Sequence, residues 1–337
     1  MATIKDVAKL ANVSPSTVSR VISDHSRISP ETKERVRQVM EALDYHPNMI
    51  ARSLITRSSQ TLGIVLSRSA ESAFSNPFFP EVIRGISSIT QKCHYYLMLA
   101  TAENHSEEAG KCLRMVREKR VDGIILLASR VNDELIKELS VKNCPFVVVG
   151  RAPEYTKCYS VNNDNVQAAN SAVRYLLNLG RRRIALLNGP EEYTFCQDRF
   201  EGYRLAFQEC GIAYEPSLAK SGTLTQEDGY RLTKELLTEK PIPSAIFCVD
   251  DLMAMGAYLA IREQRLSIPN DIAVVGFNDD PIASVIEPKL TSIRIPIYEM
   301  GVCAAEMMIQ ALAGKEVSPS QKILSSELII RESCGSK

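Results

Sequence analysis

Residues 13–21 read VSPSTVSRV, and this stretch carries the strongest local structural signal in the chain. Ser14 can cap a helix, because its hydroxyl accepts a hydrogen bond from a backbone N–H of the first turn. Pro15 then stands at the first helical position, where a missing N–H costs nothing. Val18 and Val21 are three residues apart and therefore lie on one helix face. The stretch predicts a short helix with one buried apolar face.

The sequence on either side predicts two further helices. Thr3 can cap residues 4–11, in which apolar side chains recur at the helical spacing i, i+3, i+4 and i+7. Ser29 and Pro30 repeat the start signal, and apolar residues of 36–43 form the inner face of a third helix. A helix, a tight turn, a second helix and a supporting helix make a helix-turn-helix unit of about 45 residues.

The outward face of the second helix has the chemistry of a DNA-contacting surface. It carries Ser16, Thr17, Ser19 and Arg20. Short hydroxyls can bond phosphates or base edges, and an arginine can bind guanine through two hydrogen bonds in the major groove. Residues 1–60 also hold nine basic and six acidic side chains, although the whole chain balances 40 against 40. This local excess favours contact with a polyanion. An ordinary solvated helix face is the alternative interpretation.

Composition limits the classes of protein that this chain can belong to. Its 337 residues are 45 % apolar and 24 % charged, which is typical of folded globular proteins. No apolar run reaches the roughly 18 residues of a transmembrane helix, and the N-terminus has no secretory apolar segment. The nine cysteines are scattered singly, so we expect reduced thiols rather than a disulfide framework. These features predict a cytoplasmic protein without membrane contact.

From Thr61 onward, short apolar strands alternate with amphipathic helices. This alternation predicts parallel sheets covered on both faces. One βα series ends near Val161 and a second begins, so we expect an α/β core of two Rossmann-like subdomains. Together they form a clamshell with a ligand cleft between them. The strands are expected at residues 62–66, 95–99, 123–127, 146–149, 184–187, 245–249 and 272–276, with further β segments at 292–295 and 323–330.

Several motifs resemble the lactose/galactose-repressor (LacI/GalR) family. In the N-terminal segment they are TIKDVAK at 3–9, NVS at 12–14, TVSRVI at 17–22 and Y-x-P-N-x-x-A-R-S-L at 45–54. In the rest of the chain they are LGRRRIA at 179–185, NGP at 188–190, D-x-M-A-x-G-A at 251–257, DIAVVGFN at 271–278 and P-x-L-T-S-I at 288–293. The resemblance implies an all-α helix-turn-helix headpiece followed by a periplasmic-binding-protein-like clamshell.

The resemblance also implies roles for individual headpiece residues. Base contacts are expected from Pro15, Ser16 and Arg20, and phosphate contacts from Thr3, Ser14, Thr17 and Ser19. Residues 47–56 match a hinge helix that folds on operator DNA, and Asn48 and Ser53 are expected to contact DNA there. Leu54 matches a side chain that wedges into the minor groove and bends the duplex. The alternative for Leu54 is a linker leucine packed on its own protein.

Candidates for the cleft lie in loops at the carboxyl ends of strands, where α/β sheets bind ligands. Phe78 and Phe79 belong to the NPFFPE stretch at 76–81, after the first strand. Their faces suit sugar rings or nucleobases, with hydrophobic packing as the alternative. Tyr193 and Arg151 are weaker candidates from loop position.

Three further cleft residues are implied by the resemblance. Arg199 matches the family's effector-binding arginine, and a guanidinium can donate two parallel hydrogen bonds to vicinal hydroxyls or a carboxylate. Asp250 and Asn278 match two other ligand-contacting positions. A surface ion pair is the alternative for Arg199, and a helix cap is the alternative for Asp250. Asn278 stands where aspartate is common in the family, so the hydrogen-bond pattern there is open.

The expected domain organisation has four parts. Residues 1–46 form the headpiece and 47–60 the hinge helix and linker. Residues 61–161 with 292–323 form the first core subdomain, and 162–291 with 324–337 form the second.

The function expected from these observations is that of a sequence-specific transcriptional repressor. It would bind a near-palindromic, double-stranded operator as a homodimer, under control of a small-molecule effector. Residues 75–85 and 162–165 resemble the maltose-operon regulators of Gram-positive bacteria, which implies maltose or a related α-glucoside. Another sugar, a sugar phosphate or a purine is the alternative effector.

Enzyme chemistry finds little support in the sequence. All four histidines lie in the first third of the chain, so half of the cleft lacks one for a Ser–His pair. No nucleotide-binding glycine motif is present, and the cysteines lack zinc-ligand spacing, so no cofactor or metal is expected. A sugar-binding protein without a transcriptional role is the remaining alternative class.

Overall fold

The computed structural model describes residues 2–46, 58–66, 70–153, 155–156 and 158–335. They belong to two separately compact units, Met1–Gln60 and Thr61–Lys337. The predicted hinge segment, with Asn48, Ser53 and Leu54, lies outside the described residues.

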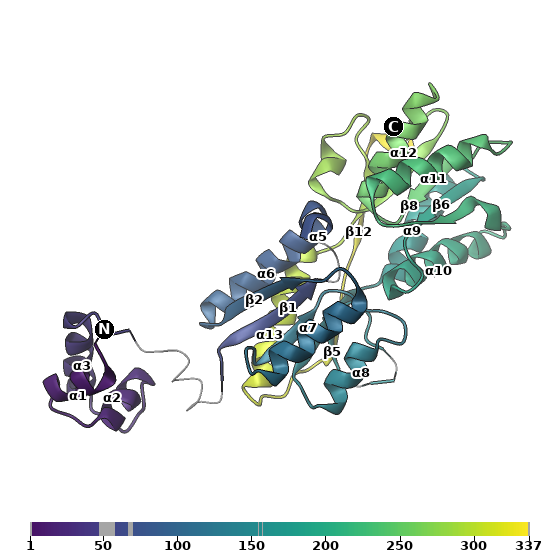
Figure 1. The fold of residues 1–337 in the computed structure, drawn as a ribbon. Helices are drawn as coiled ribbons and strands as arrows, with labels where there is room; N and C mark the ends of the chain where they lie inside the picture. The colour runs from purple at the N-terminus through teal and green to yellow at the C-terminus, as the bar shows by residue number, and fades with distance from the viewer. Residues whose placement is uncertain (1, 47–57, 67–69, 154, 157, 336–337) are drawn as a thin grey trace. The chain divides into compact units, whose positions relative to one another are not determined.

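The N-terminal unit contains the three predicted helices (Figure 1), α1 (Ile4–Leu10), α2 (Pro15–Ile22) and α3 (Pro30–Ala42). Each begins as its capping residue predicts. The side-chain oxygens of Thr3, Ser14 and Ser29 accept hydrogen bonds from backbone N–H groups of the first turn. The helices enclose a small apolar core of Val7, Ala8, Ala11, Val18, Val21 and Val36.

The C-terminal unit contains two six-stranded sheets, each with its own helices (Figure 1). The first sheet has the order β11-β5-β4-β3-β1-β2, and all its pairings are parallel. Its strands are β1 (Thr61–Leu66), β2 (Tyr96–Thr101), β3 (Gly123–Leu126), β4 (Phe146–Val149), β5 (Tyr159–Asn163) and β11 (Gln321–Leu324). We call this sheet and its helices the first subdomain. The helices are α5 (Ala70–Ser75), α6 (Phe78–Lys92), α7 (His105–Arg117), α8 (Glu134–Val141) and α13 (Ile297–Leu312).

The central strands of the first sheet, β1, β3 and β4, are buried on both faces, as their continuous apolar runs predict. Ile64 and Ile125 belong to the core cluster that contains α6 and α13 residues, whereas Val65 and Ile124 belong to the cluster that contains α7 and α8 residues. Successive residues of a strand point to opposite faces. The alternation therefore shows helices packed on each side.

The second sheet has the order β12-β10-β9-β8-β6-β7 and is parallel except for the antiparallel β10–β12 pair. Its strands are β6 (Ile184–Asn188), β7 (Ala219–Ser221), β8 (Ala245–Cys248), β9 (Ala273–Asn278), β10 (Thr291–Arg294) and β12 (Glu327–Ile329). This sheet and its helices form the second subdomain. The helices are α9 (Asn165–Asn178), α10 (Thr194–Glu209), α11 (Gln226–Thr238) and α12 (Asp251–Glu263), with 3-10 turns η1 (Pro216–Leu218), η2 (Pro281–Ser284) and η3 (Glu332–Cys334).

The chain passes between the two subdomains after β5, after β10 and after β11. The predicted boundary at residue 292 differs from the strand pairing, because Ser292 pairs with Gly276 of β9 and so belongs to the second sheet. The predicted boundary at residue 162 falls within β5, where Asn162 and Asn163 pair with β11. The pairing of β5 extends beyond its last apolar residue, Val161, which explains the difference at 162. The β segment at 292–295 was predicted, but the local sequence does not show which sheet a strand joins, which explains the difference at 292.

Two glycines allow α6 and α13 to pack closely in the first subdomain. A Cβ atom on Gly85 would lie 2.1 Å from the Tyr298 carbonyl oxygen, and one on Gly301 would lie 2.2 Å from the Val82 carbonyl oxygen. Each helix therefore needs a residue without a side chain at this crossing. The crossing holds α13, which comes from late in the sequence, on the first sheet. In the described part of the chain, no helix has both the length and the apolar character needed to cross a membrane.

Candidate functional site

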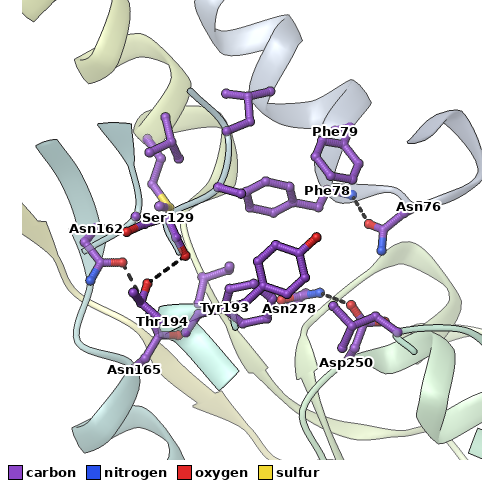
Figure 2. A pocket seen from close by; sticks show the side chains of 18 of the residues that line it. Asn76, Phe78, Phe79, Ser129, Asn162, Asn165, Tyr193, Thr194, Asp250 and Asn278 are labelled. Atoms are coloured by element: carbon purple, nitrogen blue, oxygen red, sulfur yellow. Dashed lines mark hydrogen bonds between the residues drawn. The ribbon is translucent and has the colours of Figure 1, made fainter. Parts of the chain in front are cut away.

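A pocket of the C-terminal unit lies between the carboxyl ends of strands from both sheets. Figure 2 shows Asn76 and Phe78 of the first subdomain, with Tyr193, Asp250 and Asn278 of the second, around this pocket. The cavity has a volume of about 90 Å³, and it opens to solvent at its mouth. It lies at the strand ends, which is where the sequence predicts the ligand cleft.

Arg199 is a buried cation that lines this pocket. Its Nε donates to Asn165 Oδ1 at 2.9 Å, and its Nη1 donates to the backbone oxygen of Val249. The guanidinium carbon lies 3.6 Å from the ring centroid of Phe277 and 4.9 Å from that of Phe195. Burial lowers the pKa of Arg199 to about 10, so the group stays protonated at neutral pH. This environment differs from the surface ion pair that was the alternative for Arg199.

Asp250 and Asn278 meet at the second-subdomain side of the pocket (Figure 2). Asp250 caps α12, accepting a hydrogen bond from the Leu252 N–H at 2.8 Å through Oδ1. Its other oxygen, Oδ2, accepts from Asn278 Nδ2 at 3.1 Å. Asp250 is therefore both a helix cap and a pocket residue, so the two interpretations of this position are compatible. The backbone of Asn278 has φ 109°, a conformation that non-glycine residues rarely adopt and that is often kept at binding sites.

Two more carboxyl groups are buried directly behind Asp250. Asp251 accepts hydrogen bonds from the Ser292 hydroxyl and the Asp280 backbone N–H, both at 2.8 Å. Asp280 is 3 % exposed, and its Oδ2 has no hydrogen-bond partner among the described residues. Burial, with the nearby charges of Asp250 and Asp279, raises the pKa of Asp280 to about 8. The second-subdomain side of the pocket is thus backed by buried carboxyl groups, which lose their protons less readily than exposed ones.

Phe78, Phe79 and Tyr193, which were among the cleft candidates, all line the pocket. The two phenylalanine rings are perpendicular, with centroids 5.4 Å apart. Phe79 also belongs to the hydrophobic core, so the packing interpretation applies to it as well. Phe78 is half-buried, and its N–H donates to Asn76 Oδ1 at 2.9 Å, which orients the start of α6.

Arg151 lies outside this pocket, which differs from its prediction as a cleft residue. It lines a neighbouring groove, where its Nε lies 3.2 Å from Asp198 Oδ1. Burial raises the pKa of Asp198 in spite of this arginine. Arg151 lies in the loop after β4, beside the pocket, but its ion pair with Asp198 turns the side chain toward α10. In this structure Arg151 links the two subdomains beside the site.

Several residues that line the pocket were not assigned to it from the sequence. They are Asn76, Glu108, Ser129, Arg130, Asn162, Asn165, Thr194 and Phe195, among others. Arg130 could have been found, because it follows β3 at the same sheet edge as the predicted candidates. Glu108 could not, because it lies in the first turn of α7, where an acidic residue is ordinary.

The predicted DNA-contacting residues of α2 lie at its start and on its outer face. Pro15, Ser16 and Arg20 are exposed, and Thr17 and Ser19 are partly exposed. The hydroxyl of Ser14 lies 2.7 Å from that of Ser16 and 2.9 Å from that of Thr17. Thr3 is occupied in a reciprocal cap with Asp6. Ser14 and Thr3 therefore have a structural role whether or not they also contact phosphate.

Comparison with known proteins agrees with this division of the chain. The model of bacterial regulatory proteins of the lacI family matches residues 3–48, and a periplasmic binding protein-like domain matches residues 173–334. The regulator MalR of Streptococcus pneumoniae is 36 % identical over 92 % of each chain. The chain belongs to the LacI family.

Two solved structures of LacI-family proteins extend the comparison to the fold. The transcriptional regulator CelR in complex with cellobiose is 31 % identical, with a TM-score of 0.77 and coverage of 99 % of this chain and 100 % of the other. The Lac repressor dimer bound to operator and an anti-inducer is 26 % identical, with a TM-score of 0.87 and 99 % coverage of both chains. The predicted family and fold class are confirmed. The relatives are transcriptional regulators and not enzymes, as predicted.

The recognition helix of this LacI-family headpiece gives a first testable prediction. Arg20→Ala should relax the preference for one base pair in each operator half-site and cost about 1–3 kcal/mol of specific binding. The reason is that an exposed arginine in the major groove can bind guanine O6 and N7 together. A competition assay over operators randomised at each position measures this preference. Arg35→Ala, an exposed arginine on α3, is the matched control. An unchanged base preference with uniformly weaker binding would instead make Arg20 a phosphate contact.

Proposed function

We propose that this LacI-family protein is a repressor that binds a near-palindromic operator as a homodimer and responds to an uncharged sugar, maltose or a related α-glucoside. The observation that carries the proposal is the chemistry of the pocket. Aromatic rings, side-chain amides and balanced charges surround one space that both subdomains line. Aromatic faces accept the C–H faces of sugar rings, and amides and charged groups pair with hydroxyls. Since its proposed target is chromosomal DNA, we place the protein in the cytoplasm.

The charges that line the pocket favour an uncharged effector over a sugar phosphate. Arg130 is paired with Glu108 at 2.9 Å, and Arg199 shares the pocket with Asp250. A helix N-terminus would attract a phosphate, but the Asp250 carboxylate already caps α12. A phosphate would therefore meet negative charge at this wall. The hydroxyl groups of a sugar can pair with the arginines and with the carboxylates, because a hydroxyl both donates and accepts hydrogen bonds.

The relatives support a sugar as the effector class. The CelR structure was solved with cellobiose, and the MalR relative has the higher identity of the two. The stretches at 75–85 and 162–165 that resemble maltose-operon regulators contain Asn76, Phe78 and Asn162, all of which line the pocket. The preference for an α-glucoside rests on this resemblance.

The dimer is supported by the exposed edge of the first sheet. Strand β2 ends the strand order, and it leaves Tyr96 64 % and Leu99 40 % exposed. Exposed apolar side chains on an unpaired edge strand are unfavourable in a monomer and are commonly covered by a partner. The Lac repressor structure, which aligns over the whole chain, contains a dimer bound to operator.

Effector control follows from the position of the pocket. A sugar that contacts both subdomains binds more tightly to one arrangement of them than to another. Operator affinity must change with that arrangement if the effector is to act. Such coupling typically amounts to about 1–3 kcal/mol and is reciprocal, so operator DNA also changes sugar affinity.

A titration of the protein onto its own upstream DNA, at fixed salt, tests the proposal. The panel contains maltose, cellobiose, glucose, glucose 6-phosphate and a purine. Maltose is expected to shift operator affinity about 5–150-fold. The sign of the shift distinguishes induction from corepression. A response to the phosphate or the purine without one to maltose would overturn the effector class. Absence of sequence-specific DNA binding would overturn the repressor function.

A further inference from the structure

Two loops, one from each subdomain, are joined by backbone hydrogen bonds at the pocket. Val131, in the loop after β3, donates its N–H to the Glu192 carbonyl oxygen at 2.9 Å. Thr194, at the start of α10, donates its N–H to the Ser129 carbonyl oxygen at 3.0 Å. Figure 2 shows Ser129 and Thr194 side by side at this junction. The hydrogen bonds of this junction hold the two subdomains together at one side of the cleft, although the chain itself does not cross between them there.

Arg130 and Tyr193 form the centre of this junction, as opposed residues of an antiparallel bridge. The guanidinium carbon of Arg130 lies 5.2 Å from the centroid of the Tyr193 ring, within the range of a cation–π contact. Arg130 is 7 % exposed, and its Nη1 is 2.9 Å from Glu108 Oε2, 2.9 Å from His105 Nδ1 and 3.9 Å from Asp133 Oδ2. The first subdomain thus fixes the arginine, and the arginine contacts a ring of the second.

The contact continues into the second subdomain as a row in which two stacked aromatic rings lie between two arginines. The Tyr193 and Phe195 rings are stacked, with centroids 5.5 Å apart and an interplanar angle of 27°. Phe195 lies 4.9 Å from the guanidinium carbon of Arg199, which lies 3.6 Å from Phe277. We call the row Arg130, Tyr193, Phe195 and Arg199 the pocket stack. All four of its members line the pocket.

We propose that Arg130, held by Glu108, is a positioning residue for effector binding, because it sets the Tyr193 and Phe195 rings as a wall against which a sugar ring packs. The inference rests on the proposed function, since it assumes a sugar in this pocket. Arg130 acts through Tyr193: its charge holds the ring against Phe195, and both rings line the pocket in which the ligand would bind. A ring fixed before binding loses less side-chain entropy when the ligand arrives.

The first test is a double-mutant cycle read out as sugar affinity by calorimetry. Arg130→Met keeps the side-chain length but removes the charge, and it should raise the Kd for maltose about tenfold. Tyr193→Leu should raise it by more. In the Tyr193→Leu background, Arg130→Met should cause less than about a twofold further loss, because the two residues act as a unit. Additive losses would overturn the positioning role.

The second test needs no sugar. Hydrogen exchange of the Val131 and Thr194 amides should be at least about fivefold faster in Arg130→Met than in the wild type, because their partners lie across the junction. Arg151→Met is the matched control, since it removes a charged contact between the subdomains, the ion pair with Asp198, but lies outside the pocket stack. It should leave exchange at the two amides, and the maltose Kd of the first test, within about twofold of the wild-type values. Unchanged exchange at both amides in Arg130→Met would overturn the inference.

The two tests separate the inference from the proposed function. If the wild type bound none of the sugars, the proposed effector class would fall, and the exchange measurement would still decide whether Arg130 positions the junction. If maltose binds but the losses add, the effector class stands and the role of Arg130 is refuted.

Discussion

Replacing Arg199 with methionine is expected to remove the response to the sugar, with at least about a 100-fold loss of effector affinity. The guanidinium is 5 % exposed and donates to Asn165 and to the backbone of Val249 from between two aromatic rings. Methionine can fill the space between the rings, but it has no donor for a hydroxyl. The variant should then bind the operator with the affinity of the sugar-free protein at every maltose concentration. Calorimetry with maltose and the DNA titration measure the two effects.

A matched control for Arg199 lies on the same helix. Arg204 is exposed and paired with Glu201 one turn away, so Arg204→Met should leave sugar affinity and operator response unchanged within about twofold. Arg199→Lys separates charge from shape. Lysine keeps the charge but lacks the planar fork that donates in two directions, so a loss of at least about tenfold is expected. Wild-type affinity in Arg199→Met, with the fold intact by circular dichroism, would refute the role.

Replacing Asp280 with asparagine is expected to stabilise the protein increasingly as the pH rises from 5 to 8.5. The unfolded chain loses this proton near pH 4, whereas the folded protein keeps it to about pH 8, because Asp280 is buried and lies near Asp250 and Asp279. Folding of the wild type therefore takes up a proton between these values, and its stability falls as the pH rises. Asparagine has the same shape and no charge to neutralise. The melting temperature of Asp280→Asn relative to that of the wild type should be higher by several degrees at pH 8.5 than at pH 5.

Asp271 provides a control in which folding lowers the pKa of the carboxyl group, whereas folding raises the pKa of Asp280. Hydrogen bonds from the Ser267 backbone and hydroxyl lower its pKa, so it is ionised throughout this pH interval. Asp271→Asn should therefore lower the melting temperature by the same amount at pH 5 and at pH 8.5. If the melting curves of Asp280→Asn and the wild type ran parallel over the interval, Asp280 would be ionised in the folded protein and the account of the buried carboxyl groups would be wrong.

Strands and helices with strong apolar periodicity were predictable from the sequence. The segment at 146–149 was predicted with the bounds that β4 has, and the other core strands differ by a few residues. Strands β5 and β7 and helix α8 were not predicted. Strand β5 reads YSVNN and β7 reads AKS, and neither has an apolar run. They are strands because a neighbouring strand supplies hydrogen-bond partners, and such partners are tertiary.

The second-subdomain side of the pocket was easier to predict than the first. Arg199, Asp250 and Asn278 stand in motifs with many matched positions, and the structure brings all three to one pocket. Arg130 and Glu108 have no comparable motif, and 22 residues separate them along the chain. Their ion pair exists because α7 begins at the edge of the first sheet where the loop after β3 lies. Arg151 shows the converse, since its neighbour Asp198 decides where its side chain points.

The amino-acid sequence by itself determined the three helices of the headpiece, the alternation of strands and helices in the core, and the family. These depend on caps, on periodicity and on motifs, which are local along the chain. Only the tertiary structure decided which sheet each C-terminal strand joins, that Arg151 leaves the pocket, and that Arg130, Tyr193, Phe195 and Arg199 form one stack. The reason is physical: these outcomes depend on contacts between groups distant in sequence, whose pairing is set by how the two sheets and their loops pack.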